Sequence, residues 1–392
     1  MAMRSPRLGA VLGSLLCLLS TACAAPTADT GTAPSTPSAA PSPTLSPEID
    51  LVDAALVELD RRGQVAQLIV VGVALADLSP ADDFGAEGVG GVFLQGRSSI
   101  PADQLAAETA RWAESAQGPR LWVGVDQEGG AVQTLSGPGF ADLPSALLQG
   151  RMPAEELAAL ADDMGASLSS AGINLNLAPV ADVVPSGTED GNAAIGAWDR
   201  QYGSTAEDVV RAAGTIADGL AAHGVTPTLK HFPGLGRVPE NPDKSRDATD
   251  DVTTRDDEQV AAFGALAGSD ADPFVMMSSA TYTQIDASTP AVFSPVVVND
   301  LLRGQLGFDG VVISDDIGAA QAVQDTPIDE RAVRFLEAGG TLMLTMDADA
   351  VDEMIDAVLA RAESDPEFAA TVDAAVRTAL TAKADAGLLP DD

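Results

Sequence analysis

Residues Gly310–Asp315 read GVVISD, a short run of β-branched residues that ends in a carboxylate. Runs of this kind are typical of buried strands. The 392-residue chain contains seven more, and each is followed by a stretch with apolar residues at helical spacing. The eight predicted strands are Val65–Val73, Val89–Gln95, Leu121–Asp126, Ile173–Val180, Thr226–His231, Phe274–Ser278, Gly310–Asp315 and Thr341–Thr345.

Strand and helix alternate eight times, which predicts an α/β fold: a single (β/α)8 TIM-type barrel over residues 47–392. A doubly wound open sheet is the alternative arrangement of the same elements. Among the helices we expect Ala206–His223, with Thr205 as its N-cap, and a closing helix, Pro366–Ala384, with Asp365 as its N-cap.

The N-terminus has the pattern of an export signal. Two arginines precede an apolar run, Leu8–Leu19, which is followed by Ser20-Thr21-Ala22-Cys23. A cysteine after small residues resembles the bacterial lipobox, so we expect a lipoprotein signal peptide over residues 1–22 and lipidation of Cys23, with palmitate among the acyl chains. Residues 23–46, rich in Ala, Pro, Ser and Thr, are then a lipid-anchored tether. Ordinary secretion without lipidation is the alternative.

Composition limits the partners. Aspartate and glutamate total 58 against 21 lysines and arginines, a formal charge of −37, and such a field repels nucleic acid and anionic lipid headgroups. Neither of the two cysteines, Cys17 and Cys23, is available for a disulfide in the mature domain. No pattern typical of a metal or nucleotide site stands out, so we expect no metal, no cofactor and a monomer.

Polar residues follow several predicted strands at the point where each ends. They are Asp126, Asp182, Lys230-His231, Ser278-Ser279 and Asp315-Asp316. In such barrels the carboxyl ends of the strands meet at one rim, where the active site lies. Acids, a lysine and a histidine at one rim favour a polyol or sugar ligand, which needs hydrogen bonds of both senses.

Four segments give a specific resemblance. GVDQEGGAVQ (Gly124–Gln133), INLNLAPVADV (Ile173–Val183), LKHFPGLG (Leu229–Gly236) and GFDGVVISDD (Gly307–Asp316) stand in this order at strand spacing. They resemble the corresponding elements of family 3 glycoside hydrolases, and in particular of the β-N-acetylhexosaminidases.

The resemblance implies that Asp315 is the nucleophile of a retaining glycosidase, and that Asp316 beside it is structural. It also implies four residues that bind sugar hydroxyls: Asp126, Arg200, Lys230 and His231. The alternatives from the residues alone are a helix cap for Asp315 and a buried ion-pair element for Lys230-His231. We expect Glu128 to brace its loop.

The chain departs from the family at the acid/base. The hexosaminidases carry an Asp-Ser-His triplet after the fifth strand, and its histidine is the acid/base. This chain has only two histidines, His223 and His231, and neither lies beyond the fifth predicted strand. We therefore expect Asp243 to be the acid, with Glu240 or Asp247 as alternatives. His223 is expected to cap the end of its helix.

Three pocket positions also differ: Leu235, Ala131 and Ser279 stand where the family usually has histidine, arginine and histidine. The leading expectation is a retaining β-glycosidase, β-N-acetylhexosaminidase-like, that hydrolyses extracellular or cell-wall glycans at the outer face of the bacterial cell membrane. A catalytically degenerate glycan-binding lipoprotein is the alternative. A solute-binding lipoprotein fits poorly, because such proteins have two lobes and lack these motifs.

Overall fold

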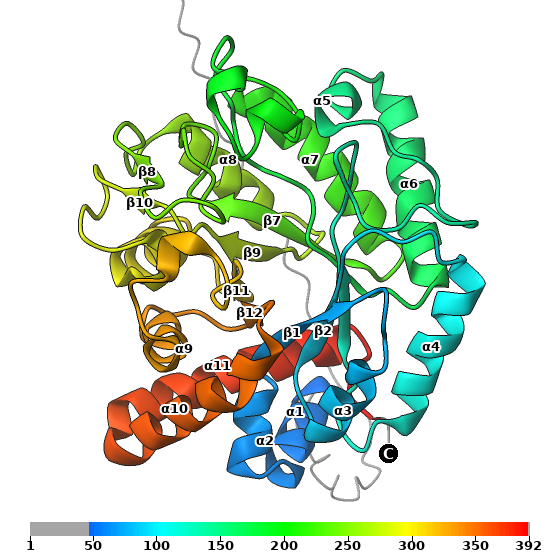
Figure 1. The fold of residues 1–392 in the computed structure, drawn as a ribbon, viewed down its shortest axis with the longest axis vertical. Coiled ribbons are helices and arrows are strands. Elements are labelled where there is room, and N and C mark those ends of the chain that lie inside the picture. Colours follow the sequence, from blue (N-terminus) through cyan, green and yellow to red (C-terminus); the bar gives the residue numbers. More distant parts are fainter. Residues whose placement is uncertain (1–46, 391–392) are drawn as a thin grey trace, which may run out of the picture. The chain divides into compact units, whose positions relative to one another are not determined.

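Eight parallel strands form one sheet in the computed structural model, which describes residues 47–390 of the chain (Figure 1). Their order is β11-β9-β7-β6-β3-β2-β1-β12, and a parallel bridge between Ile313 and Leu342 links the two end strands. The strands are β1 (Ile69–Ala74), β2 (Gly91–Gln95), β3 (Trp122–Val125), β6 (Leu175–Asn176), β7 (Thr226–Phe232), β9 (Phe274–Met277), β11 (Val312–Ser314) and β12 (Met343–Thr345). The predicted barrel is confirmed, and the open sheet is excluded.

Helices follow the strands and cover the outside of the barrel (Figure 1). They are α1 (Pro47–Glu58), α2 (Arg61–Ala66), α3 (Pro80–Glu87), α4 (Ala102–Ser115), α5 (Ala146–Gln149), α6 (Ala154–Ser170), α7 (Ala206–Ala221), α8 (Glu258–Ala267), η4 (Val296–Gln305), α9 (Ile328–Glu337), α10 (Val351–Ser364) and α11 (Pro366–Asp385). Both predicted N-caps are confirmed, because Thr205 accepts from the N–H of Asp208 and Asp365 from that of Glu367. Across residues 47–390, no helix combines the length and apolar character needed to span a membrane.

Two predicted strands differ from the observed ones by more than two residues at one end. The first was expected to begin at Val65, but Val65 and Ala66 belong to α2 and bury its apolar face, so the apolar run crosses from a helix into β1. The fourth was expected over Ile173–Val180, but its ladder covers only the two residues of β6, with an isolated bridge at Val180. Pro179 has no N–H to donate to a ladder.

The prediction for His223 was also wrong. Helix α7 ends at Ala221, and the ring Nε2 of His223 lies 2.8 Å from Oδ1 of Asp162 in α6. The ring therefore pairs two neighbouring helices instead of capping the carbonyl groups of its own.

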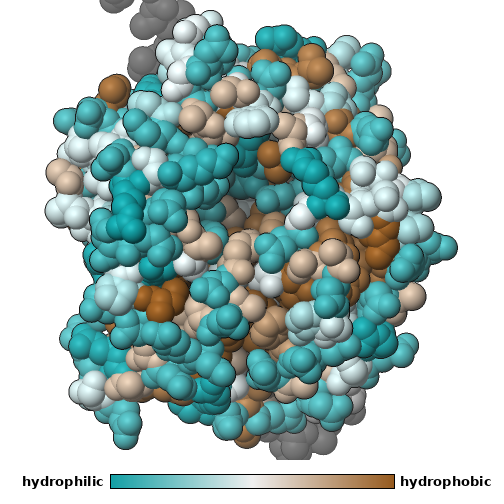
Figure 2. Space-filling view, in the orientation of Figure 1, coloured by the Kyte–Doolittle hydropathy of each residue, from teal (hydrophilic) through white to brown (hydrophobic). Residues whose placement is uncertain are grey.

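Loops at the carboxyl ends of the strands carry small additional sheets. Strands β4 (Gln127–Gly129) and β5 (Val132–Gln133) form a hairpin after β3, and β8 (Thr249–Asp250) pairs with β10 (Thr281–Tyr282). Figure 2 shows this face of the molecule hollowed near its centre, with hydrophilic side chains on one part of the edge and apolar ones on the other. The loops therefore leave one depression over the end of the barrel.

Candidate active site

A pocket of about 210 Å³ lies at the carboxyl ends of the strands. All six predicted catalytic and sugar-binding residues line it: Asp126, Arg200, Lys230, His231, Asp243 and Asp315. Its apolar walls are Phe93, Leu177, Ala194, Leu235, Pro242, Met276, Leu344 and Met346, and Asn241 and Asp316 complete it. Residues far apart in the sequence thus meet at the rim where the strand ends were expected to converge.

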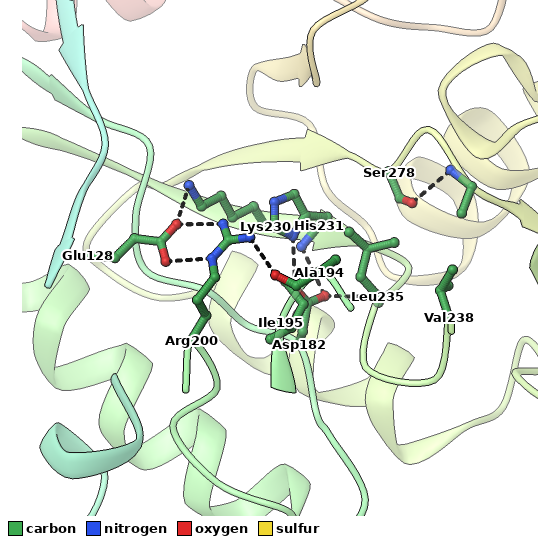
Figure 3. A network of polar contacts seen from close by, with 12 residues as sticks. Glu128, Asp182, Ala194, Ile195, Arg200, Lys230, His231, Leu235, Val238 and Ser278 are labelled. Carbon is green, nitrogen blue, oxygen red and sulfur yellow. Dashed lines mark hydrogen bonds and ion pairs between the residues drawn. The ribbon is translucent and has the colours of Figure 1, made fainter. Parts of the chain in front are cut away.

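Glu128 holds the two cations of the pocket in place. Its carboxylate accepts from Nε and Nη2 of Arg200 at 2.9 and 2.7 Å, and its Oε1 lies 2.7 Å from Nζ of Lys230 (Figure 3). Nζ of Lys230 also donates to Oδ1 of Asp126 at 2.6 Å, and Nη1 of Arg200 to the carbonyl of Ala194 at 3.0 Å. Glu128 is only 2% exposed and does not line the pocket, and its carboxylate braces Arg200 and Lys230.

These ion pairs fix the charges in the pocket. Burial disfavours the charged form of Glu128, but Arg200 and Lys230 outweigh it and lower the pKa of Glu128 to about 2. Burial likewise opposes the charge on Lys230, but Asp126 and Glu128 raise its pKa. Lys230 is thus both a buried ion-pair element and a wall of the pocket. Both cations keep their charge at neutral pH and can donate hydrogen bonds to a ligand.

Asp182 fixes the orientation of His231. The Oδ2 atom of Asp182 lies 2.8 Å from Nδ1 of His231, and its Oδ1 accepts the main-chain N–H groups of His231 and Leu235 at 3.1 and 2.7 Å (Figure 3). Asp182 is fully buried. With Nδ1 committed to this carboxylate, the other ring nitrogen is left for a ligand. The sequence placed Asp182 at a strand end but gave no sign of this partner.

Asp315 stands directly after β11 on the wall of the pocket. Its N–H donates to the carbonyl of Met277 at 3.3 Å, and its Oδ1 accepts the N–H of Asp316 at 2.8 Å. Burial raises the pKa of Asp315, while the nearby charge of His231 and that of Lys230 oppose the rise. Asp315 caps no α-helix, because the next one, α9, begins only at Ile328.

Asp316 ties two loops together. Its Oδ1 accepts the N–H groups of Gly318, Ala319 and Met346 at 2.9, 3.1 and 3.0 Å. It therefore joins the loop after β11 to the end of β12, which agrees with its predicted structural role. Burial raises the pKa of Asp316 despite these donors.

The β7–β8 loop, residues 233–248, brings Asp243 over the pocket. At its start Gly234 has a φ of 129°, and a Cβ on Gly236 would lie 1.9 Å from the carbonyl oxygen of Val183. Both positions therefore require glycine. The side-chain amide of Asn192 donates to the carbonyl groups of Leu235 and Val238 at 2.7 and 2.8 Å and holds this part of the loop.

A second contact holds the tip of the β7–β8 loop. The N–H of Ala322 donates to the carbonyl of Pro242 at 2.9 Å, and the N–H of Gln321 to that of Asp243 at 3.3 Å. Asn241 accepts the N–H of Asp243 through its side chain at 2.8 Å. Because residues 321 and 322 belong to the loop that follows Asp315, this backbone clasp ties the segment that carries Asp243 to that loop.

Asp243 lies at the opening of the pocket, and its pKa is raised there. Its side chain is exposed to solvent on one side, and the desolvation by the protein on the other side, together with the charge of Asp315, raises the pKa of Asp243 to about 6. Glu240 and Asp247 are exposed, as Asp243 is, but they do not line the pocket. Of the three acids considered from the sequence, the structure therefore brings only Asp243 to the site.

The three departures from the family pattern lie in different places. Leu235 is buried in the pocket wall, Ala131 lies between β4 and β5 outside the pocket, and Ser279 is buried behind it. The hydroxyl of Ser279 has no hydrogen-bond partner within the described part of the chain. Only Leu235 thus changes the pocket surface directly. Residues 47–390 contain no grouping of His, Cys, Asp and Glu suited to a metal ion.

Known proteins resemble this chain in both sequence and fold. The family model for the glycosyl hydrolase family 3 N-terminal domain matches residues 61–382. A β-hexosaminidase of Stenotrophomonas maltophilia is 34% identical over 307 residues, which are 75% of this chain and 88% of that protein.

Two crystal structures give the same result. The β-N-acetylhexosaminidase of Beutenbergia cavernae is 47% identical with a TM-score of 0.79, and the match covers 83% of this chain and 99% of that one. A family 3 glycosyl hydrolase of Mycobacterium smegmatis is 30% identical with a TM-score of 0.71, covering 86% and 99%. The barrel, the pocket residues and these relatives agree, and the chain belongs to glycosyl hydrolase family 3, whose members hydrolyse glycosyl compounds.

Proposed function

We propose that this glycosidase is a retaining β-N-acetylhexosaminidase in which Asp315 is the nucleophile and Asp243 the acid/base. The observation that carries the proposal is that both carboxylates line one small pocket, together with two fixed cations and an oriented histidine. A retaining glycosidase needs one carboxylate to attack the anomeric carbon and a second group to protonate the departing oxygen. The names of the relatives support the choice of sugar.

In the first step the Asp315 carboxylate attacks the anomeric carbon, and the bond from that carbon to the glycosidic oxygen breaks. The proton of Asp243 passes to that oxygen, which leaves as an alcohol. The raised pKa of Asp243 suits this step, because a large fraction of the group is protonated near pH 6.

In the second step water attacks the anomeric carbon of the glycosyl-enzyme, and the bond to Asp315 breaks. Asp243, now a carboxylate, takes the proton of the water and returns to its acid form. Asp126, Arg200, Lys230 and His231 hold the sugar hydroxyls through both steps. Because their partners fix them before the ligand arrives, they lose little freedom when it binds.

The test uses the purified protein with a panel of 4-nitrophenyl β-glycosides and a matched set of alkyl β-glycosides. We expect Asp315→Asn to abolish turnover of both sets. Asp243→Asn should slow the alkyl glycosides by about 10²–10⁴-fold and the nitrophenyl glycosides far less, because nitrophenolate leaves without a proton.

The controls are Glu240→Gln and Asp247→Asn, which alter the exposed carboxylates of the same loop. Selective loss of alkyl-glycoside turnover in either control would move the acid role to that residue. Glycan binding without turnover of any glycoside would favour the alternative, a catalytically degenerate glycan-binding lipoprotein.

We also propose that the protein is exported and anchored through Cys23 at the outer face of the cell membrane, where extracellular or cell-wall glycans are its substrates. The supporting pattern, residues 1–46, lies outside the described residues. Cys23→Ala should release the protein from the membrane fraction of expressing cells and abolish labelling by radioactive palmitate. Unchanged membrane association of the variant would contradict the anchor.

A further inference from the structure

One tryptophan of the three is exposed. Trp112 and Trp122 are 4% and 0% exposed and belong to the core, whereas 53% of Trp198 is accessible. Tryptophan is highly buried on average, so an exposed one is informative where it lies beside a functional site.

The Trp198 side chain is held at one edge. Its Nε1 donates to the carbonyl of Ala193 at 3.2 Å, so the only polar atom of the indole is paired within the protein. Trp198 ends the short helix η2 (Gly196–Trp198), and the next residue, Asp199, has a left-handed φ of 54°. The ring is therefore an apolar surface on an ordered turn.

The segment that carries Trp198 also builds the pocket. Ala194 and Arg200 line the pocket on either side of it in sequence. The N–H of Ala193 donates to the carbonyl of Pro239 in the β7–β8 loop at 3.0 Å. Figure 3 shows Ala194 and Ile195 beside Arg200 and Asp182. Trp198 does not line the pocket itself, but it lies in the segment between two residues that do, and this segment is bonded to the loop that carries Asp243.

A second exposed apolar side chain lies next to this turn. The N–H of Leu147 donates to the carbonyl of Asp199 at 3.1 Å, which brings α5 against η2. Leu148 in α5 is 53% exposed. The exposed large apolar side chains of residues 47–390 are Val57, Leu148, Trp198 and Val252, so two of the four occur on segments that contact each other.

We infer that Trp198 is the platform on which the first sugar ring of the leaving group stacks. The pocket, at about 210 Å³, is smaller than the roughly 300–1,000 Å³ of sites for drug-sized ligands. It accommodates one monosaccharide unit, so the next ring of a β-linked glycan lies outside it. The C–H face of a pyranose is apolar and matches an indole face. The inference rests on the proposed function and extends it to the leaving-group side.

The first experiment uses Trp198 as its own reporter, because the other two tryptophans are buried. Quenching by acrylamide is measured on the full-length Asp315→Asn protein, which does not turn over its ligand, and calorimetry measures binding in parallel. N,N′-diacetylchitobiose should lower the quenching constant severalfold, whereas N-acetylglucosamine, which fits inside the pocket, should leave it unchanged. Binding of the disaccharide with no protection of Trp198 would overturn the inference and leave the proposed function standing. Absence of disaccharide binding by this variant, together with absence of turnover by the wild-type protein, would instead remove the proposed function, and the inference with it.

The second experiment is kinetic. Trp198→Ala should lower kcat/KM for N,N′-diacetylchitobiose about five- to tenfold, mainly through KM, and Trp198→Phe should restore most of the loss. Hydrolysis of N-acetylglucosaminyl β-fluoride should not change, because fluoride is too small to reach the platform. Val57→Ala, which truncates an exposed apolar side chain in α1, is the matched control. Equal losses on both substrates, or no loss on the disaccharide, would refute the platform.

Discussion

Glu128→Gln tests how much the buried ion pairs of the pocket contribute to stability. The change keeps the shape of the side chain and removes the charge that Arg200 and Lys230 share. A pKa of about 2 for Glu128, against its ordinary 4.5, means that the folded protein favours the carboxylate. At about 1.4 kcal/mol for each pKa unit, this preference is worth about 3 kcal/mol at neutral pH, within the range for breaking a buried ion pair.

Urea unfolding followed by circular dichroism at pH 7 measures the loss. The pH dependence gives a second check with a defined sign. A lowered pKa stabilises the fold above the unfolded value near 4.5, and this contribution disappears as the pH falls toward about 2. The difference in free energy of unfolding between wild type and Glu128→Gln should therefore disappear as the pH falls from about 4.5 to about 2.

Glu337→Gln is the matched control, because Glu337 pairs with Arg361 at 2.9 Å in an exposed position. Glu337→Gln should lower the free energy of unfolding by no more than about 1 kcal/mol. A cost below about 1 kcal/mol for Glu128→Gln, or a gap that does not depend on pH between 2 and 5, would refute the electrostatic reasoning.

Three further outcomes are expected. The kcat/KM for alkyl glycosides should fall above about pH 6, as Asp243 loses its proton, and this alkaline limb should be absent in Asp243→Asn; a limb that persists in the variant would contradict the assignment. Asp182→Ala should cost about 3 kcal/mol or more in urea unfolding, because three hydrogen bonds to a buried carboxylate are lost, and a change below 1 kcal/mol would contradict that role. Arg331→Met should lower both the free energy of unfolding and kcat/KM for alkyl glycosides. The buried guanidinium of Arg331 donates to the carbonyl groups of Ile317, Gly318 and Thr326, and so holds the loop that clasps the Asp243 segment. Wild-type kcat/KM for these substrates would show that Arg331 does not position the acid.

The barrel could be predicted from the sequence because each of its strands is marked by a short, local pattern of residues. Each strand is a β-branched run, and the polar residue that ends it falls at the same rim in any barrel of this type. That is why Asp126, Lys230, His231 and Asp315 were placed in one pocket without a structure. The exact start of β1 could not be predicted, because the apolar face of α2 continues into the strand without a break.

The contacts between residues far apart in the sequence could not be predicted from local sequence patterns. Asp182 lies 49 residues from His231 in the sequence, and only the packing of β6 beside β7 brings them together. The placement of Asp243 depends on the clasp to residues 321 and 322, which no spacing pattern encodes. The sequence therefore predicted three candidate acids in the β7–β8 loop, and the tertiary contacts place only one of them, Asp243, in the pocket.

The clasp also bears on how the protein can change during evolution. Its two hydrogen bonds run from main chain to main chain, from residues 321 and 322 to residues 243 and 242. The identities of Gln321 and Ala322 contribute nothing to those bonds, so many residues other than proline can stand there. An insertion or deletion between Asp315 and Gln321 would instead shift the donors and move the acid. At this loop, natural selection is therefore expected to preserve length more strictly than composition.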